Sequence, residues 1–168
     1  MSKYKIGLIG AQGTGKTTAA YELAAELKRR GKDVYVLSEV ARSCPLPLND
    51  AATIESQFWI MGKQLTREQS AISEILVSDR TLMDSLIYGY RKYPDMFRSL
   101  KPFVKRYMET YAAVIYFSPN DDYLMEDGTR SVDKQFRDEI DALMVAMIEE
   151  FDVETKSIEQ VLSMYGGK

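Results

Sequence analysis

Histidine is absent from this 168-residue sequence, and cysteine occurs only once, as Cys44. Without histidine there is no Ser-His or Cys-His nucleophile system and no histidine-ligated zinc site, so a general base must be a carboxylate or, less favourably, a lysine or tyrosine. A single cysteine excludes an intramolecular disulfide and suits a reducing compartment. The formal net charge of −3 lacks the basic excess that duplex-DNA-binding proteins usually carry.

Long apolar runs are also missing. No segment approaches the roughly 20 apolar residues that span a bilayer, and the N-terminus leads into a short apolar strand and not into a signal-peptide core. We therefore expect a cytoplasmic protein. The length favours one domain, residues 1–168, with its own hydrophobic core. The oligomeric state stays open, and a homodimer is possible.

Short apolar, β-rich runs alternate with longer helical stretches along the chain. This alternation predicts an α/β fold in which helices cover both faces of a parallel sheet. Strands are expected at residues 5–9, 33–37, 75–78 and 113–117, with a weaker fifth strand at 151–154. Helices are expected at residues 16–30, 53–73, 82–92, 96–110 and 133–150.

A glycine-rich loop follows the first predicted strand and fits the phosphate-binding pattern G-x-x-x-x-G-K-[ST] over residues 10–17. Its glycines let the backbone curl with N–H groups pointing inward, and the next helix adds its positive N-terminal end. A lysine and a hydroxyl at the end of the motif serve the β- and γ-phosphates and Mg²⁺. The motif predicts ATP and Mg²⁺ as cofactors, bound by Gly10, Gln12, Gly13, Thr14, Gly15, Lys16, Thr17 and Thr18.

Asp79 and Arg80 come at the end of the third predicted strand. An acid at the tip of a parallel strand beside the phosphate loop faces the nucleotide site. The segment D-R-T-L-M-D-S-L-I-Y at residues 79–88 resembles the D-R-[YST]-x-x-x-S-x-x-x-Y segment of thymidylate kinases and deoxynucleoside kinases. The resemblance implies that Asp79 lies by Mg²⁺ and its water shell and that Arg80 binds phosphate or the acceptor. A surface Asp–Arg pair without such a role is the alternative.

Residues 127–141 resemble the lid of small P-loop kinase-like proteins that include the nicotinamide riboside kinase domain of a bacterial NAD-biosynthesis regulator. This implies a lid at about residues 119–137, with Arg130 as the main cation that closes over the phosphates. Arg137 would assist in binding the nucleotide. For Arg137, a helix-face ion pair with Asp133 or Asp141 is the alternative.

Glu39 and Arg42 follow the second predicted strand. In nucleoside kinases a glutamate at this place acts as general base for the acceptor hydroxyl, and an arginine close behind binds the acceptor. Because the sequence has no histidine, Glu39 is the best candidate for the base, although a strand-end ion pair is the alternative. On the next helix, Gln57 is an amide that needs a partner, whereas Phe58 and Trp59 favour a core role over stacking on a base.

The resemblance extends over residues 5 to about 160 and implies the strand order 2-3-1-4-5 of P-loop kinases. It implies an ATP- and Mg²⁺-dependent phosphotransferase acting on a nucleoside or (deoxy)nucleoside monophosphate. Lys16, Glu39, Asp79, Arg80 and Arg130 would be catalytic; Thr17 and Asp79 would serve the metal; Glu39, Arg42, Gln57 and Arg80 would bind the acceptor.

Two other functions stay open. One is a kinase acting on a 5′ end or modified base in DNA. The cluster Arg98, Lys101, Lys105 and Arg106 gives it a small foothold, with a solvated helix face as the alternative. The other is an ATPase or switch protein without an acceptor.

Overall fold

The computed structural model describes residues 4–119 and 134–166. Its elements, in chain order, are β1 (Tyr4–Ile9), α1 (Lys16–Arg29), β2 (Val34–Leu37), η1 (Val40–Ser43), η2 (Asn49–Ala51), α2 (Ile54–Ser70), β3 (Ile75–Asp79), α3 (Leu82–Lys92), α4 (Pro94–Arg98), α5 (Lys101–Met108), β4 (Ala113–Tyr116), α6 (Lys134–Phe151) and α7 (Ile158–Met164). The predicted lid, apart from its first residue and the start of α6, lies outside the described residues.

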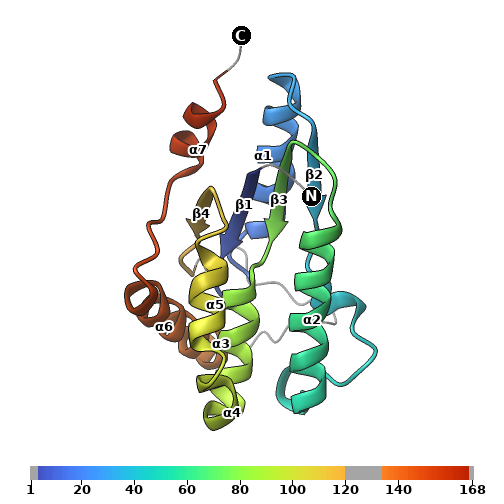
Figure 1. Cartoon of the computed structure of the whole chain (residues 1–168). Helices are drawn as coiled ribbons and strands as arrows, with labels where there is room; N and C mark the ends of the chain where they lie inside the picture. Colours follow the sequence, from blue (N-terminus) through green and yellow to red (C-terminus); the bar gives the residue numbers. More distant parts are fainter. Residues whose placement is uncertain (1–3, 120–133, 167–168) are drawn as a thin grey trace.

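The strands form one parallel sheet in the order β2-β3-β1-β4. The register pairs Leu8 with Asp79, and Ile9 with Tyr116. The carboxyl ends of β1 and β3 therefore lie side by side. Because ligands of open parallel sheets bind beyond the carboxyl ends of the strands, this edge is where a site is expected. In Figure 1 the strands point downward, toward the half of the molecule that contains α3, α4 and the start of α2.

The prediction of a fifth strand at 151–154 is wrong for the described part of the chain. Helix α6 runs on to Phe151, and Asp152 then turns the chain with a positive φ of 56°. Only Thr155 reaches the edge of the sheet, where it forms an isolated parallel bridge with Val114. The backbone N–H of Lys156 donates a 2.8 Å hydrogen bond to the carbonyl of Val114. The sheet that the structure describes thus has four strands.

Two hydrophobic clusters cover the two faces of the sheet. On one face, α1 packs Leu23 and Leu27 against Ile6 and Leu8 of β1, and α7 adds Val161. On the other, α3, α5 and α6 pack against β1 and β4 through residues that include Ile9, Leu86, Val104, Val114, Ile140 and Met144. Figure 1 shows α1 behind the strands, and α3 and α5 below them, toward the end where the strands point. Every residue of β3 is buried, as a strand covered on both faces requires.

The helices begin and end close to their predicted bounds, with one exception. The expected helix at 96–110 is two helices, α4 and α5, and each has a proline in its first turn. Proline is accepted at the start of a helix and not in its interior, so Pro102 marks a new start. Within the described ranges, no helix is long and apolar enough to cross a membrane.

Candidate active site

The phosphate loop joins β1 to α1 at the carboxyl edge of the sheet. Gly10, Gly13 and Gly15 have positive φ angles of 144°, 65° and 81°, which glycine adopts without steric cost. A β-carbon on Gly10 would overlap the backbone carbonyl of Phe117 beyond β4. The first turn of α1 contains no acidic residue, and its N-cap makes no side-chain hydrogen bond. The positive end of this helix is therefore left uncapped by the protein's own side chains, as an anion site requires.

Lys16 lies inside this loop and is 5% exposed. Its ammonium donates hydrogen bonds to the carbonyl of Ala11 and, at 2.9 Å, to Oγ1 of Thr14. Burial, aided by the nearby positive charge of Arg80, lowers the pKa of Lys16 from 10.5 to about 7. A phosphate group would supply the negative charge that this buried ammonium needs.

Thr17 and Asp79 lie together where α1 begins and β3 ends. The Thr17 hydroxyl donates a 2.6 Å hydrogen bond to Oδ2 of Asp79, which is 3% exposed. The described residues contain no group of three or more histidine, cysteine, aspartate or glutamate side chains that would hold a metal unaided. This hydroxyl–carboxylate pair therefore fits Mg²⁺ bound together with phosphate oxygens and water. Thr18, the next residue, is exposed.

Arg80 connects the phosphate loop to the second strand. Its Nε donates to Oε1 of Glu39 at 2.9 Å, and its Nη1 donates to the carbonyl of Gly10 at 3.0 Å and to Oδ1 of Asp84 at 3.2 Å. The guanidinium also lies 5.1 Å from the centre of the Tyr88 ring. Arg80 thus contacts both Glu39 and the phosphate loop, and brings these two predicted parts of the site together.

The carboxylates around Arg80 are themselves held in place. Glu39 accepts a second hydrogen bond through Oε2, from Nε of Arg42 at 3.2 Å. Asp84 is 1% exposed and accepts from the backbone N–H of Thr81 at 2.8 Å, within a capping box at the start of α3. Burial raises the pKa of Asp84. Sequence reasoning missed Asp84, although the Thr-x-x-Asp spacing of the capping box was a signal for its position.

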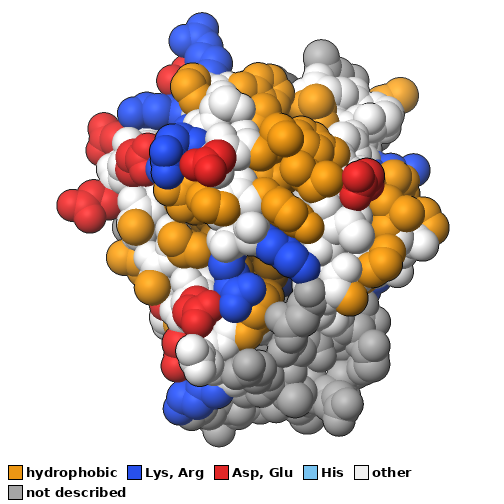
Figure 2. Space-filling model, turned by 90° about the horizontal axis from the view of Figure 1, so that it is seen from below, with side chains coloured by type: hydrophobic (Ala, Val, Ile, Leu, Met, Phe, Trp, Pro, Cys, Tyr) orange, Lys and Arg blue, Asp and Glu red, His pale blue; other side chains and the backbone are white. Residues whose placement is uncertain are grey.

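A cavity lies beside Arg80, on the side of α2 and η1. It is lined by Gln12, Glu39, Ala41, Arg42, Leu48, Asn49, Gln57, Ile60, Arg80, Asp84, Ser85, Tyr88, Arg91, Lys92 and Phe136. The cavity thus includes the predicted residues Glu39, Arg42, Gln57 and Arg80. Gln12, predicted to contact the cofactor, also lines it. Figure 2 views the molecule from the end toward which the strands point, where Lys and Arg side chains lie beside a broad area of hydrophobic ones.

Two amides in this cavity have unused hydrogen-bonding groups. Gln57 is 6% exposed, and its side chain bonds to no residue within 4–119 and 134–166. Gln12 is 4% exposed; its Oε1 accepts from the Tyr88 hydroxyl at 2.9 Å, but its buried Nε2 has no partner among the described residues. Because a buried amide N–H without a partner is costly, Nε2 of Gln12 suits a polar ligand. The Gln57 side chain lines the same cavity and can bind that ligand too.

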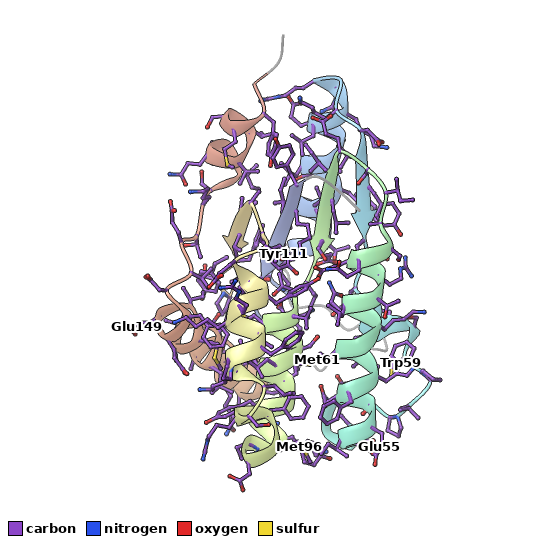
Figure 3. All side chains as sticks on the ribbon, in the orientation of Figure 1. Glu55, Trp59, Met61, Met96, Tyr111 and Glu149 are labelled. Atoms are coloured by element: carbon purple, nitrogen blue, oxygen red, sulfur yellow. The ribbon has the colours of Figure 1, made fainter. Side chains whose placement is uncertain are left out.

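Phe58 and Trp59 contribute less to the core than expected. Phe58 is 41% exposed, and its ring is tilted by 30° against that of Phe97, with centroids 5.2 Å apart. Trp59 is half-buried, with the Lys63 ammonium 5.9 Å from its ring. Figure 3 shows Met61 on the inner side of α2 and Trp59 on its outer side. The residues of α2 that face inward are Gln57 and Met61, and not Phe58 and Trp59.

Arg137 lies in α6 and is 2% exposed, which is too deep for a solvated helix-face pair. Its Nε is 3.4 Å from Oδ1 of Asp138, while Asp141 accepts a 2.8 Å hydrogen bond from the Tyr116 hydroxyl. Arg130 and Asp133 lie outside the described residues. The predicted contacts of Arg130 and Arg137 with nucleotide stay predictions.

The basic cluster on α4 and α5 is largely neutralised by neighbouring groups. Lys101 pairs with Glu150 at 2.6 Å, and Arg106 pairs with Glu109 at 3.4 Å. Lys105 donates to the backbone carbonyl of Glu150, and Arg98 lies 3.9 Å from Asp95. Paired cations of this kind offer a weak electrostatic surface to nucleic acid.

Comparison with known proteins agrees with this geometry. Three solved structures share the fold along most of the chain. Deoxyadenosine kinase from M. mycoides, solved with the products dCMP and dCDP, has a TM-score of 0.61 at 16% identity and covers 92% of this chain and 90% of its own. The YorR protein from Bacillus subtilis, in complex with phosphorylated GDP, has a TM-score of 0.57 at 16% identity over 95% and 94% of the two chains.

The third structure is NadR in complex with NAD and AMP-PNP. It has a TM-score of 0.69 at 17% identity and covers 99% of this chain, which spans only 50% of NadR. No curated protein sequence matches the chain. The model of a family described as "AAA domain" matches residues 5–161, which is nearly the whole sequence. The resemblance predicted from the loop and the Asp-Arg segment is therefore confirmed: the chain belongs to this AAA-domain family and has the fold of the P-loop nucleoside and nucleotide kinases.

Proposed function

We propose that the protein transfers the γ-phosphate of ATP to a nucleoside or a nucleoside monophosphate. The observation that carries the proposal is the position of Arg80. One guanidinium bonds both to Gly10 of the phosphate loop and to Glu39 in the wall of the cavity. A phosphate donor in the loop and an acceptor in the cavity would thus meet at the same cation, which suits a transferring phosphoryl group.

The donor side binds the triphosphate. The backbone N–H groups of the loop and the uncapped end of α1 would hold the β- and γ-phosphates, and Lys16 would add its charge once phosphate restores its proton. Thr17 and Asp79 would hold Mg²⁺, which neutralises charge on the phosphate oxygens when it is bound. The AMP-PNP complex of NadR supports ATP as the donor.

The acceptor side positions the attacking oxygen. In the transfer, the acceptor oxygen forms a bond to the γ-phosphorus and the bond from that phosphorus to the ADP oxygen breaks. For a hydroxyl acceptor the displaced proton passes to the carboxylate of Glu39; for a phosphate acceptor Glu39 only orients the group. Arg42 and the free amides of Gln12 and Gln57 would bind the rest of the acceptor.

The two other functions predicted from the sequence have less support. A kinase acting on DNA needs a basic groove, and the basic cluster of α4 and α5 is occupied by ion pairs. An ATPase without an acceptor needs no second binding site, whereas the cavity beside Arg80 is lined by Gln12, whose buried Nε2 has no partner among the described residues. A small, polar acceptor accounts for both observations.

An ADP-release assay tests the proposal. The purified protein is incubated with ATP and Mg²⁺, either alone or with nucleosides, nucleoside monophosphates or DNA oligonucleotides. We expect at least one nucleoside or monophosphate to stimulate ADP release well above the acceptor-free rate, and Lys16→Ala to abolish the stimulation. Lys28→Ala is the matched control, because Lys28 is an exposed lysine of the same helix. Stimulation by oligonucleotides alone, or by no acceptor, would reject the proposal.

A further inference from the structure

A buried polar network lies behind Arg80, on the side away from the cavity. It consists of Lys5, Gln64, Glu68, Tyr107 and Tyr111, and we call it the anchor network. Figure 3 shows Tyr111 in the interior, close below the strands. The network uses ionisable groups that the proposed reaction does not need, so its position calls for an explanation.

Glu68 of α2 is the centre of the anchor network and is 2% exposed. Its Oε1 accepts from the Tyr111 hydroxyl at 2.6 Å and from Nε2 of Gln64 at 2.7 Å. Its Oε2 accepts from the Tyr107 hydroxyl at 3.0 Å and from the Lys5 ammonium at 3.4 Å. The ammonium also lies over both tyrosine rings, 4.1 and 4.5 Å from their centroids. Four donors, one of them the buried Lys5 ammonium, thus fix this carboxylate in one position.

Gln64 links Glu68 to the backbone of Arg80. It lies one helical turn before Glu68 and is 1% exposed. Besides its bond to Glu68, its Nε2 lies 2.9 Å from Oγ of Ser78 and 3.1 Å from the backbone carbonyl oxygen of Arg80. Ser78 donates a further 2.7 Å hydrogen bond to that same carbonyl. Nε2 of Gln64 has two protons: one goes to Glu68, and the other is shared between Oγ of Ser78 and the Arg80 carbonyl. The Arg80 carbonyl is therefore held by Ser78 and by a shared N–H of Gln64 that is tied to Glu68.

The backbone at Arg80 needs such support. Its φ angle is 112°, in the region that glycine favours and that side chains with a β-carbon rarely adopt. A residue in such a conformation persists only where its surroundings over-determine it. At Arg80 the unusual backbone directs the side chain to Gly10, Glu39 and Asp84.

We propose that Gln64, anchored by Glu68, is a positioning residue that holds Arg80 in this conformation and so aims its guanidinium between the phosphate loop and Glu39. Gln64 is not among the residues that line the cavity, so it acts only through Arg80. The consequence for turnover rests on the proposed function, because it requires Arg80 to serve phosphoryl transfer. The effect on the Arg80 side chain itself does not.

The first test is made on the protein alone. Arg80 Nε–H is assigned in ¹⁵N-edited NMR spectra as the signal lost in Arg80→Lys, and its exchange with solvent is measured in Gln64→Met. This substitution keeps the length of the side chain and removes the amide. We expect exchange about five- to tenfold faster than in the wild type, as the loss of one buried hydrogen bond allows. Gln69→Met is the matched control: Gln69 is on the same helix and donates to Tyr107 at 3.1 Å, without reaching Arg80.

Unchanged exchange in folded Gln64→Met would overturn the proposal, and so would equal acceleration in Gln69→Met, because that would indicate general loosening of α2. If Gln64→Met does not fold, Gln64→Leu takes its place, since it also removes the amide and leaves Ser78 and Glu68 unchanged. Faster exchange of Arg80 Nε–H in Gln64→Leu supports the proposal, and unchanged exchange overturns it.

The second test measures turnover as ADP release with ATP and an equimolar mixture of the four deoxynucleosides and their 5′-monophosphates. We expect Gln64→Met to lower kcat and leave the KM for ATP nearly unchanged. In the Arg80→Ala background the same substitution should have no further effect, because the interaction it removes acts through Arg80. A full additional loss in that background would overturn the proposal. If Arg80→Ala alone leaves turnover intact, the proposed function fails, and the exchange measurement still decides whether Gln64 positions Arg80.

Discussion

The hydroxyl of Thr17 donates a 2.6 Å hydrogen bond to the carboxylate of Asp79. This bond connects the first turn of α1 to the tip of β3, and it occupies the place where a cation bound with phosphate would lie. We therefore expect Asp79→Asn to weaken the Mg²⁺ dependence of nucleotide binding by about 10–100-fold, the usual cost of losing a group that orients metal ligands or their waters.

A Mg²⁺ titration of ATP binding measures this effect. Asp33→Asn provides the control, because Asp33 is an exposed aspartate just before β2, at the opposite end of the sheet. An Asp79→Asn protein with the same Mg²⁺ midpoint as Asp33→Asn would show that Asp79 has no part in the metal site.

The lowered pKa of Lys16 predicts that the protein takes up a proton when it binds ATP. In the free protein, burial and the charge of Arg80 lower the pKa of Lys16 to about 7. Polyphosphate raises the pKa because it stabilises the ammonium form. At pH 8 the free lysine is mostly neutral and the bound lysine mostly charged, so binding consumes a proton. The affinity for ATP should therefore fall as pH rises above 7, by at most about tenfold per pH unit.

Calorimetric titration at pH 8, in two buffers with different ionisation enthalpies, measures the proton uptake directly. We expect close to one proton per ATP in the wild type and a clearly smaller uptake in Lys16→Gln. Equal uptake in the two proteins would assign the proton to another group.

Lys16 also affects stability in a defined pH window. Its pKa is lower in the folded protein than in the unfolded chain, so the unfolded chain binds more protons between pH 7 and 10.5. The free energy of unfolding contributed by this lysine therefore increases with pH across that window. Urea unfolding of the wild type and of Lys16→Met should show that the advantage of Lys16→Met shrinks as pH rises from 7 to 9. A constant difference would contradict the lowered pKa.

Glu39 distinguishes between the two classes of acceptor. If the acceptor is a hydroxyl, Glu39→Gln removes the base and should lower kcat by about 10²–10⁴-fold. If the acceptor is a phosphate, the amide still orients it and the loss should be far smaller. Steady-state ADP release with a nucleoside and with its monophosphate separates these cases. The control is Glu55→Gln, an exposed position at the start of α2. A loss below tenfold with a hydroxyl acceptor would exclude Glu39 as its base.

Gln57 should affect binding of the acceptor and not of ATP. Gln57 is 6% exposed and lines the cavity, and its side chain bonds to no other residue that the structure describes. Gln57→Leu should raise the KM for the acceptor about three- to tenfold, as expected for one lost hydrogen bond, with the KM for ATP unchanged. Gln69→Leu is the matched substitution on the same helix. An equal rise in both KM values would place Gln57 outside the acceptor site.

Sequence patterns were sufficient for the parts of the fold that local physics determines. Alternating apolar segments placed β1 to β4 and the main helices, and proline and glycine marked several of their ends. The fifth strand failed because α6 continues through Phe151 before Asp152 turns the chain. The apolar residues there satisfy the packing of a helix end as well as they would a strand, and periodicity over four residues does not distinguish the two.

The same distinction applies to the candidate site: some of its residues could be placed from the sequence, and others could not. The glycine loop and the strand-end residues could be placed because a motif and the edge of a parallel sheet fix their neighbourhood. Asp84 as a partner of Arg80, the Tyr88–Gln12 bond and the contact of Gln64 with the Arg80 carbonyl depend on helices that meet only in three dimensions. Phe58 was misjudged because helical spacing indicates which residues share a face and does not say how far that face is covered.

The cavity draws its two halves from different parts of the chain. Gln12 and Arg80 come from the phosphate loop and the end of β3, and α3 adds Asp84, Ser85, Tyr88, Arg91 and Lys92. Leu48, Asn49, Gln57 and Ile60 belong to the stretch between β2 and the middle of α2. For protein engineering this is a modular arrangement. Residues 45–60 offer a cassette that can be exchanged between relatives to retune acceptor preference, while Arg42 and its bond to Glu39 stay in place.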